Sequence, residues 1–240
     1  MKKIKKLLFV GAFAFIASCG SSETGDTAKS DNTTDSTATE SANSFKESIY
    51  NGSKVKIGNQ IWMAENLNVD VFSNGEPIPE AKTAKEWNDA AKNEKPAWCY
   101  YDNDAENGKK FGKLYNWFAV SDPRGLAPKG WHVSSHEEWI ALSAFVGSPV
   151  GKKIKNDSGW DLSGWTESNG DNSYGFNGLP GGCRSDDGTF LSLNGYGYFW
   201  TSTENNITTA HGRSLAVYDD IDRKKSSKGS GLTVRCIKDK

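Results

Sequence analysis

The sequence has few of the residues on which catalytic and metal sites usually depend: its 240 residues include four cysteines, three histidines and two methionines. It contains neither a glycine-rich phosphate loop with its Lys-Ser/Thr nor a Gly-x-Ser-x-Gly nucleophile elbow. Beyond residue 18 it has no apolar run long enough to cross a bilayer as a helix. It also lacks a basic stripe, so we expect no binding to nucleic acid.

The N-terminal segment carries the clearest signal. Four lysines among the first six residues precede an apolar stretch, residues 7–17, that is too short to span a bilayer. The next residues overlap this stretch and resemble the lipobox of bacterial lipoproteins: Ile16, Ala17, Ser18 and Cys19. The resemblance implies a signal peptide over residues 1–18 and acylation of Cys19, which anchors the chain to a membrane. We therefore expect a cell-envelope protein at the outer membrane or cell surface. An ordinary secretory signal with an incidental cysteine is the alternative.

The remaining chain divides by composition. Residues 19–47 comprise the expected lipidated cysteine and a disordered tether, because residues 20–44 are rich in Ser, Thr, Asp and Glu and have almost nothing to bury. Residues 48–240 are expected to form a single globular domain. Its nine tryptophans and many glycines favour a loop-rich, mostly β structure. Cleavage of the leader removes four lysines and no acid, which changes the formal net charge from −1 to −5.

Local patterns predict several elements. Residues 54–57 and 60–63 form a hairpin around Gly58 and Asn59, with Val55 opposite Trp62. A capping box from Thr83 to Glu86 opens one helix.

A second capping box, from Ser134 to Glu137, opens a helix that ends at Gly147. One face of this helix is expected to be apolar, with Trp139, Leu142, Phe145 and Val146. Three strands are expected over residues 198–203, 213–218 and 232–237, with a basic loop over 224–231.

A long loop spans residues 157–182, and its part from Asp157 to Asn177 is the expected ligand surface. A loop of this length is either packed by its own side chains or functional. Aromatic rings that stack on a ligand, together with polar groups that bind its edges, are typical of binding sites. We take the candidate ligand-binding residues to be Trp160, Trp165, Asn169, Asp171, Asn172 and Tyr174. The alternative is that these aromatic side chains pack inside the fold.

The sequence contains only parts of the patterns that are typical of metal-binding sites. His132 and His136 are four positions apart, but a cap at Ser134 places His132 outside the helix. Asp102, Asp104 and Glu106 alternate as in a calcium loop. That segment lacks the glycine of an EF-hand loop, and Lys113 stands where its final Glu is needed. We therefore expect a solvated turn and no cofactor, with calcium as the alternative.

The domain resembles the Fibrobacter succinogenes major paralogous domain of bacterial surface lipoproteins. The resemblance covers about residues 53–239 and rests on ordered strings: Gly58-Asn-Gln-Ile-Trp-Met-Ala-Glu-Asn-Leu67, Trp98-Cys-Tyr-Tyr-Asp102, Gly112-Lys-Leu-Tyr-Asn-Trp117, Leu126-Ala-Pro-Lys-Gly-Trp-His-Val133, Glu138-Trp139, Tyr174-Gly-Phe176, Leu179-Pro-Gly-Gly182, Phe199-Trp-Thr-Ser-Thr-Glu204 and Val234-Arg-Cys236. Cys183 departs from the family, which more often has an aromatic residue there. The resemblance implies an α+β, C-type-lectin-like fold: loop-rich and mixed, with short antiparallel strands, about two helices, and pairing between strands near both ends.

The resemblance also implies a disulfide between Cys99 and Cys236, since the family strings have cysteine at both positions and export leads to an oxidising compartment. Pairing of Cys183 with Cys236 or with Cys99 stays open, because spacing does not decide connectivity.

Two classes of function follow as hypotheses. The leading one is a non-catalytic, surface-displayed binding or adhesion module for a glycan or a surface protein. The alternatives are an envelope enzyme distantly related to formylglycine-generating enzymes, which share the late pattern of this sequence and would need a reactive cysteine, and a structural surface-coat protein.

Overall fold

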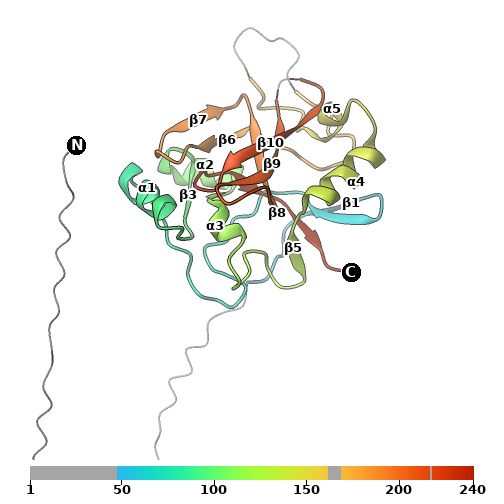
Figure 1. Ribbon diagram of the computed structural model, residues 1–240. Helices are drawn as coiled ribbons and strands as arrows, with labels where there is room; N and C mark the ends of the chain where they lie inside the picture. The colour runs from blue at the N-terminus through green and yellow to red at the C-terminus, as the bar shows by residue number, and fades with distance from the viewer. Residues whose placement is uncertain (1–47, 162–168, 217) are drawn as a thin grey trace, which may run out of the picture. The chain divides into compact units, whose positions relative to one another are not determined.

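The computed structural model of the chain describes residues 48–161, 169–216 and 218–240 (Figure 1). The expected signal peptide, Cys19, the tether up to residue 47 and Trp165 lie outside these residues.

The first sheet joins the two ends of the described chain. β1 (Lys54–Ile57) and β2 (Gln60–Met63) form the predicted hairpin, with Val55 opposite Trp62. Gly58 in its turn has a φ of 60°, which glycine adopts at no steric cost. The C-terminal strand β12 (Cys236–Lys238) pairs with β2, and β5 (Trp131–Val133) pairs with β12 on its other side. The expected pairing of strands near both ends is therefore present.

The second sheet has the strand order β10-β9-β8-β6-β7. These strands are β10 (Ile221–Ser227), β9 (Thr209–Leu215), β8 (Gly197–Glu204), β6 (Gly181–Arg184) and β7 (Phe190–Leu193). A short strand, β11 (Thr233–Val234), runs parallel to β8, and β3 (Trp98–Cys99) pairs separately with β4 (Leu114–Tyr115).

Predictions for three late segments need correction. The strand expected over residues 213–218 is the end of β9, which stops at Leu215. Part of the expected basic loop, residues 224–227, belongs to β10, which pairs with β9 along its whole length. Polar residues occupy both faces of this strand, so the alternation that marks a strand is missing. The expected strand 232–237 divides into β11 and β12, which belong to different sheets.

Five α-helices occur in the described residues, where the sequence predicted about two. The predicted two are α1 (Ala84–Lys92) and α4 (His136–Val146). The others are α2 (Ala105–Phe111), α3 (Trp117–Val120) and α5 (Val150–Ile154), and a 3-10 turn, η1 (Tyr101–Asn103), precedes α2. Side-chain oxygens of Asp104 and Asn116 cap α2 and α3. These helices have only four to seven residues, too few for a clear apolar periodicity.

Helix α4 begins one residue later than predicted. The capping box is formed by Ser135 and Glu138, whereas Ser134 is buried and its hydroxyl oxygen accepts a hydrogen bond of 2.8 Å from Nε1 of Trp139. Trp139 and two further predicted residues, Leu142 and Val146, are buried. Phe145 is 58 % exposed, because it lies around the helix from the buried face.

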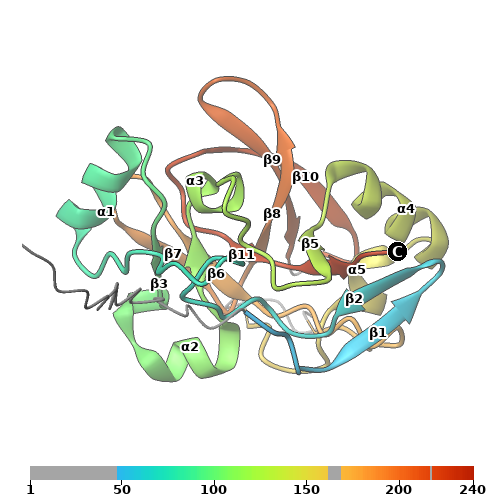
Figure 2. The ribbon, with the colours of Figure 1, turned by 90° about the horizontal axis from the view of Figure 1, so that it is seen from below.

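Three clusters of buried side chains form the core. The largest lies between the two sheets, the second lies under α4, and the third lies under α1. Figure 2 shows α1 and α2 at one end of the described domain and α4 with the β1–β2 hairpin at the other, with β8 between them. In the second cluster, Trp139 packs edge-on against Trp62, with ring centroids 5.0 Å apart.

Buried cations connect segments that are distant in the chain. Arg235 donates to the side-chain oxygen of Asn66 and to the backbone oxygens of Met63, Phe176 and Asn177. Arg184 donates to the backbone oxygens of Ala81 and Gly188, and its guanidinium lies 4.9 Å from the ring centroid of Trp87. Lys113 donates to Asn68 and lies over the ring of Trp98. Neutral oxygens and aromatic faces therefore replace water around these charges.

Candidate functional site

The predicted ligand residue Trp160 is a core residue, which corrects its assignment. It is 3 % exposed and belongs to the cluster under α4. Asn169 holds the backbone there, because its Oδ1 accepts a hydrogen bond of 3.0 Å from the Trp160 backbone nitrogen. The structure thus brings these two predicted residues together to close the loop. Trp165 lies outside the described residues, so its assignment stays a prediction.

The other predicted ligand residues also make contacts that shape the loop. Oδ1 of Asp171 accepts from the Ser173 backbone nitrogen at 2.9 Å, and Oδ1 of Asn172 accepts from the Asn177 backbone nitrogen at 2.8 Å. The ring of Tyr174 lies edge-on to that of Phe145, at 6.2 Å between centroids. Turn formation and packing therefore account for the candidate residues of this loop that the structure describes.

The calcium candidates take part in a helix start. Asp102 has a φ of 54° within η1. Oδ1 of Asp104 accepts from the Glu106 backbone nitrogen at 2.9 Å, and Glu106 pairs with Lys109 at 2.6 Å. Throughout residues 48–161, 169–216 and 218–240, no group of three His, Cys, Asp or Glu side chains is placed to hold a metal ion.

A groove of about 570 Å³ lies along the segment from Pro123 to Val133. Trp131 lines it and packs edge-on against Tyr50, with ring centroids 5.0 Å apart. Ser202 and Asp239 complete its wall from β8 and the C-terminus. We call this feature the Trp131 groove.

Charged side chains border the Trp131 groove. Nδ1 of His132 lies 2.7 Å from Oδ1 of Asp239, and Nε2 lies 2.8 Å from Oε1 of Glu138. Burial favours the neutral form of His132, but the two carboxylates outweigh it and raise the imidazole pKa above its ordinary 6.5. Arg124 also lines the groove and pairs with Glu76 and Asp122 at 2.7 and 2.8 Å.

Sequence reasoning did not predict this groove. Trp131 and His132 stand in the string from Leu126 to Val133, which marks the family, and from the sequence His132 is considered only as a metal ligand with His136. His132 and Asp239 are 107 positions apart, so no local pattern reports their contact. A Trp-His pair directly after a Pro-Lys-Gly turn was the available signal.

The sequence of residues 55–238 matches the family model of the Fibrobacter succinogenes major domain. The chain belongs to this family. No curated protein and no solved structure matches the chain. This match confirms the family resemblance inferred from the ordered strings. The helices and sheets of the structure confirm the α+β class. The C-type-lectin-like fold stays a prediction.

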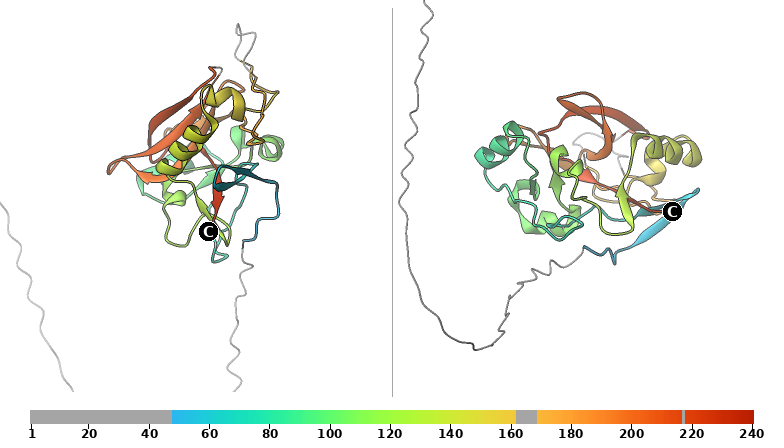
Figure 3. Two further views of the ribbon diagram at one scale, coloured as in Figure 1. Left: turned by 90° about the vertical axis from the view of Figure 1, so that its right-hand side faces the viewer. Right: turned by 60° about the horizontal axis from the view of Figure 1, so that its bottom comes forward.

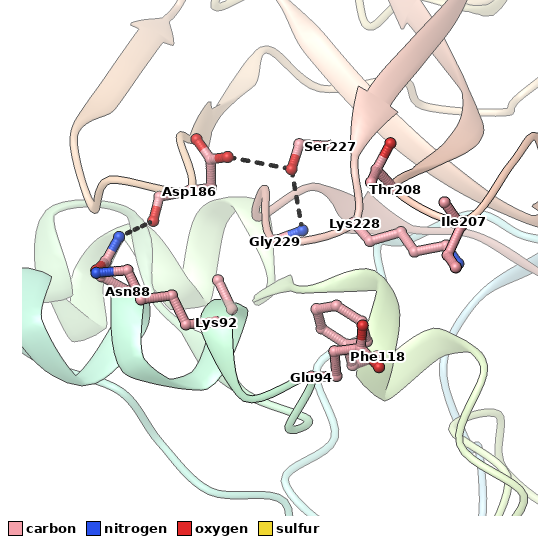
Figure 4. Close-up of a pocket in the computed structure, with 11 residues that line it drawn as sticks. Asn88, Lys92, Glu94, Phe118, Asp186, Ile207, Thr208, Ser227, Lys228 and Gly229 are labelled. Carbon is pink, nitrogen blue, oxygen red and sulfur yellow. Dashed lines mark hydrogen bonds between the residues drawn. The ribbon is translucent and has the colours of Figure 1, made fainter. Parts of the chain in front are cut away.

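Another hollow of this Fibrobacter succinogenes major domain, about 290 Å³, lies where α1 meets the end of β10 (Figure 4). Nδ2 of Asn88 donates to the backbone oxygen of Asp186 at 3.1 Å, and Oγ of Ser227 donates to Oδ2 of Asp186 at the same distance. These bonds join α1, the β6–β7 turn and β10. The polar lining therefore holds the fold together, and we interpret this hollow as a packing seam beside the exposed Ile207.

The cysteines of the domain do not form the expected disulfide. Cys99, Cys183 and Cys236 all carry free thiols in the structure. Cys99 lies in the cluster under α1, whereas Cys236 lies in the cluster between the sheets, so the folded chain buries them among different neighbours. Burial raises the pKa of the Cys99 thiol to about 12 and that of Cys183 to about 11.

Within the described residues of this chain, no helix has the length and apolarity needed to cross a membrane.

Proposed function

We propose that the chain is a lipid-anchored binding or adhesion module displayed at the bacterial cell surface, with a glycan or a surface protein as its ligand. The anchor is acylated Cys19, and residues 20–47 hold the domain away from the membrane. The lipobox-like run at Cys19 supports this placement.

The Trp131 groove is the observation that carries the binding proposal. Small-molecule and sugar sites combine an apolar wall with a few polar groups that bind the ligand's edges. Trp131 supplies an aromatic surface, Asp239 supplies a carboxylate that accepts hydrogen bonds from the ligand, and His132 holds that carboxylate in place. The groove volume of about 570 Å³ falls within the range of ligand sites.

The states of the thiols favour binding over the enzyme alternative. A formylglycine-type enzyme would need a reactive thiolate or a pair of cysteines that hold copper. Burial raises the pKa values of Cys99, Cys183 and Cys236, which disfavours the thiolate at neutral pH. This supports a non-catalytic module.

A glycan and protein array probed with residues 48–240 tests the proposal. Ser202→Arg places a long side chain in the groove from an exposed position, and Ser202→Ala is its matched control. We expect Ser202→Arg to weaken binding to the array hit at least tenfold, while Ser202→Ala binds as the wild type does. An array without hits, or a hit that Ser202→Arg binds unchanged, contradicts the proposed site.

A further inference from the structure

Basic side chains face each other on the β9–β10 ribbon. In the antiparallel register, Arg213 lies opposite Arg223 and His211 lies opposite Lys225. Alternation along each strand places all four side chains on one face of the sheet. Directly opposed like charges destabilise a sheet, so the Arg213–Arg223 pair costs stability unless an anion lies between the two guanidinium groups.

Arg213 is a buried cation whose donors are incompletely satisfied. It is 2 % exposed, and its Nη2 donates to the backbone oxygen of His136 at 2.9 Å. Its Nε is buried without a hydrogen-bond partner. Arg184 and Arg235, in contrast, direct their Nε atoms at oxygens of Gly188 and Asn66. A buried donor without a partner costs free energy of folding, and a bound acceptor would remove that cost.

The groups around Arg213 are mainly basic. The rings of His136 and His211 are 4.5 Å apart, and Nδ1 of His136 lies 3.3 Å from Nη2 of Arg213. Burial and the charge of Arg223 lower the pKa of Arg213 to about 10. Two acids face the cluster: Glu137 from the start of α4, and Asp220, which precedes β10 and lines the hollow described next. Within the described residues, neither forms an ion pair with Arg213 or Arg223.

A hollow of about 360 Å³ opens beside these groups, between α4 and the β9–β10 ribbon. Figure 3 shows α4 alongside the two strands. Arg213 and Arg223 line the hollow, and Ile140, Ala144 and Ile221 form apolar walls. Exposed Ile140 gives the hollow an apolar rim on the solvent side.

We propose that this hollow binds the oxyanion of a compact ligand about the size of a monosaccharide, with Arg213 and Arg223 holding the oxyanion and the apolar walls contacting the ligand body. The guanidinium fork matches carboxylate and phosphate oxygens and discriminates them from neutral groups. The hollow shares no lining residue with the Trp131 groove, so it is a second site beyond the proposed function.

Thermal unfolding of the full chain in a non-ionic detergent tests this site. The probes are sodium D-glucuronate, sodium glucose 6-phosphate and neutral D-glucose, with ionic strength held constant by sodium chloride. A ligand that binds the native state raises its midpoint by mass action. We expect glucuronate or glucose 6-phosphate to raise the midpoint by about 3 °C at ten times its dissociation constant, and glucose to leave it unchanged. The stronger of the two charged sugars identifies the preferred oxyanion.

Two variants separate the site from general salt effects. Arg223→Gln removes an exposed cation from the face that carries Arg213. Lys224→Gln removes the next cation, which belongs to the opposite face and pairs with Asp222 at 3.6 Å. We expect Arg223→Gln to lose at least half of the midpoint shift and Lys224→Gln to keep it. Equal shifts in both variants, or no shift beyond that of sodium chloride, overturn the proposal.

Discussion

Asn66 and Arg235 are 169 positions apart, yet Oδ1 of Asn66 accepts a hydrogen bond of 2.7 Å from Nε of Arg235. The same Asn66 donates through Nδ2 to the backbone oxygen of Phe111 at 2.8 Å. The pair therefore connects the first hairpin, the end of α2 and the last strands of the domain. Both side chains are buried, so each hydrogen bond replaces one that water would otherwise make.

Replacement of Arg235 should destabilise the domain strongly. Arg235→Met keeps much of the side-chain volume but leaves buried oxygens of Met63, Phe176 and Asn177 without donors. We expect the free energy of unfolding in urea to fall by about 3–5 kcal/mol. Lys238→Met, at an exposed position of the neighbouring strand, is the control and should cost less than about 0.5 kcal/mol. Equal effects of the two variants would contradict the connecting role.

A pair of substitutions in α4 tests the corrected helix face. Trp139→Ala removes a fully buried ring that touches Trp62, Phe176 and Phe199, and should lower the free energy of unfolding by about 3–5 kcal/mol. Phe145→Ala removes a ring that is 58 % exposed, and should cost about 1 kcal/mol or less. Chemical denaturation measures both. A loss from Phe145→Ala as large as that from Trp139→Ala would restore the face predicted from the sequence.

Local signals in the sequence predicted the elements that short-range chemistry determines. The turn at Gly58, the capping box at Thr83 and the helix end at Gly147 depend on residues within a few positions of each other. The start of α4 was wrong by one residue because Ser134 and Ser135 are both suitable caps. The surrounding packing decides between them, since it buries Ser134 against Trp139.

Contacts between residues that are far apart in the chain could not be predicted from local patterns. Strand β10 depends on pairing with β9, and its polar sequence gives no alternation of its own. The candidate sites depend on contacts such as that between His132 and Asp239, or on the register that places Arg213 opposite Arg223. The composition of residues 157–182 shows that the loop is rich in aromatic residues, but it does not show that Trp160 is buried.

Protonation of His132 should contribute to stability in a limited pH window. The raised pKa of His132 adds stability that is complete below 6.5 and is lost as the pH rises through the folded-state value. Burial favours protonated Glu138, but hydrogen bonds from Ser135 and His132 outweigh it and lower its pKa, so its contribution is lost as the pH falls below 4.5. The contacts of His132 should therefore stabilise most between about pH 4.5 and 6.5.

Urea unfolding of wild type and His132→Gln at pH 5.5 and 8.5 measures this contribution. The histidine side chain is 42 % exposed, so solvent screening should keep the difference below about 1 kcal/mol at pH 5.5. It should shrink at pH 8.5. A difference that grows with pH would mean that the neutral imidazole is the stabilising form.

The three cysteines of the domain should behave as shielded, unpaired thiols. Burial raises their pKa values, so native protein at pH 8 should react slowly with a disulfide reagent, and unfolded protein should release three equivalents. Peptide mapping without reductant should recover Cys99, Cys183 and Cys236 in separate peptides. A peptide that links Cys99 to Cys236 would instead support the pairing that the family strings imply.

Acylation of Cys19 should determine where the protein is found. We expect wild-type protein from a bacterial host to begin at Cys19, to carry acyl mass and to partition into detergent, since two or more buried chains anchor a protein stably. Cys19→Ala removes the acceptor thiol and should abolish the acyl mass. Intact-mass spectrometry and detergent partition compare the two proteins, with Cys183→Ala as a control that removes a cysteine from the folded domain. Wild-type protein that lacks acyl mass would show that the leader is an ordinary secretory signal, and the proposed surface display would then need another anchor.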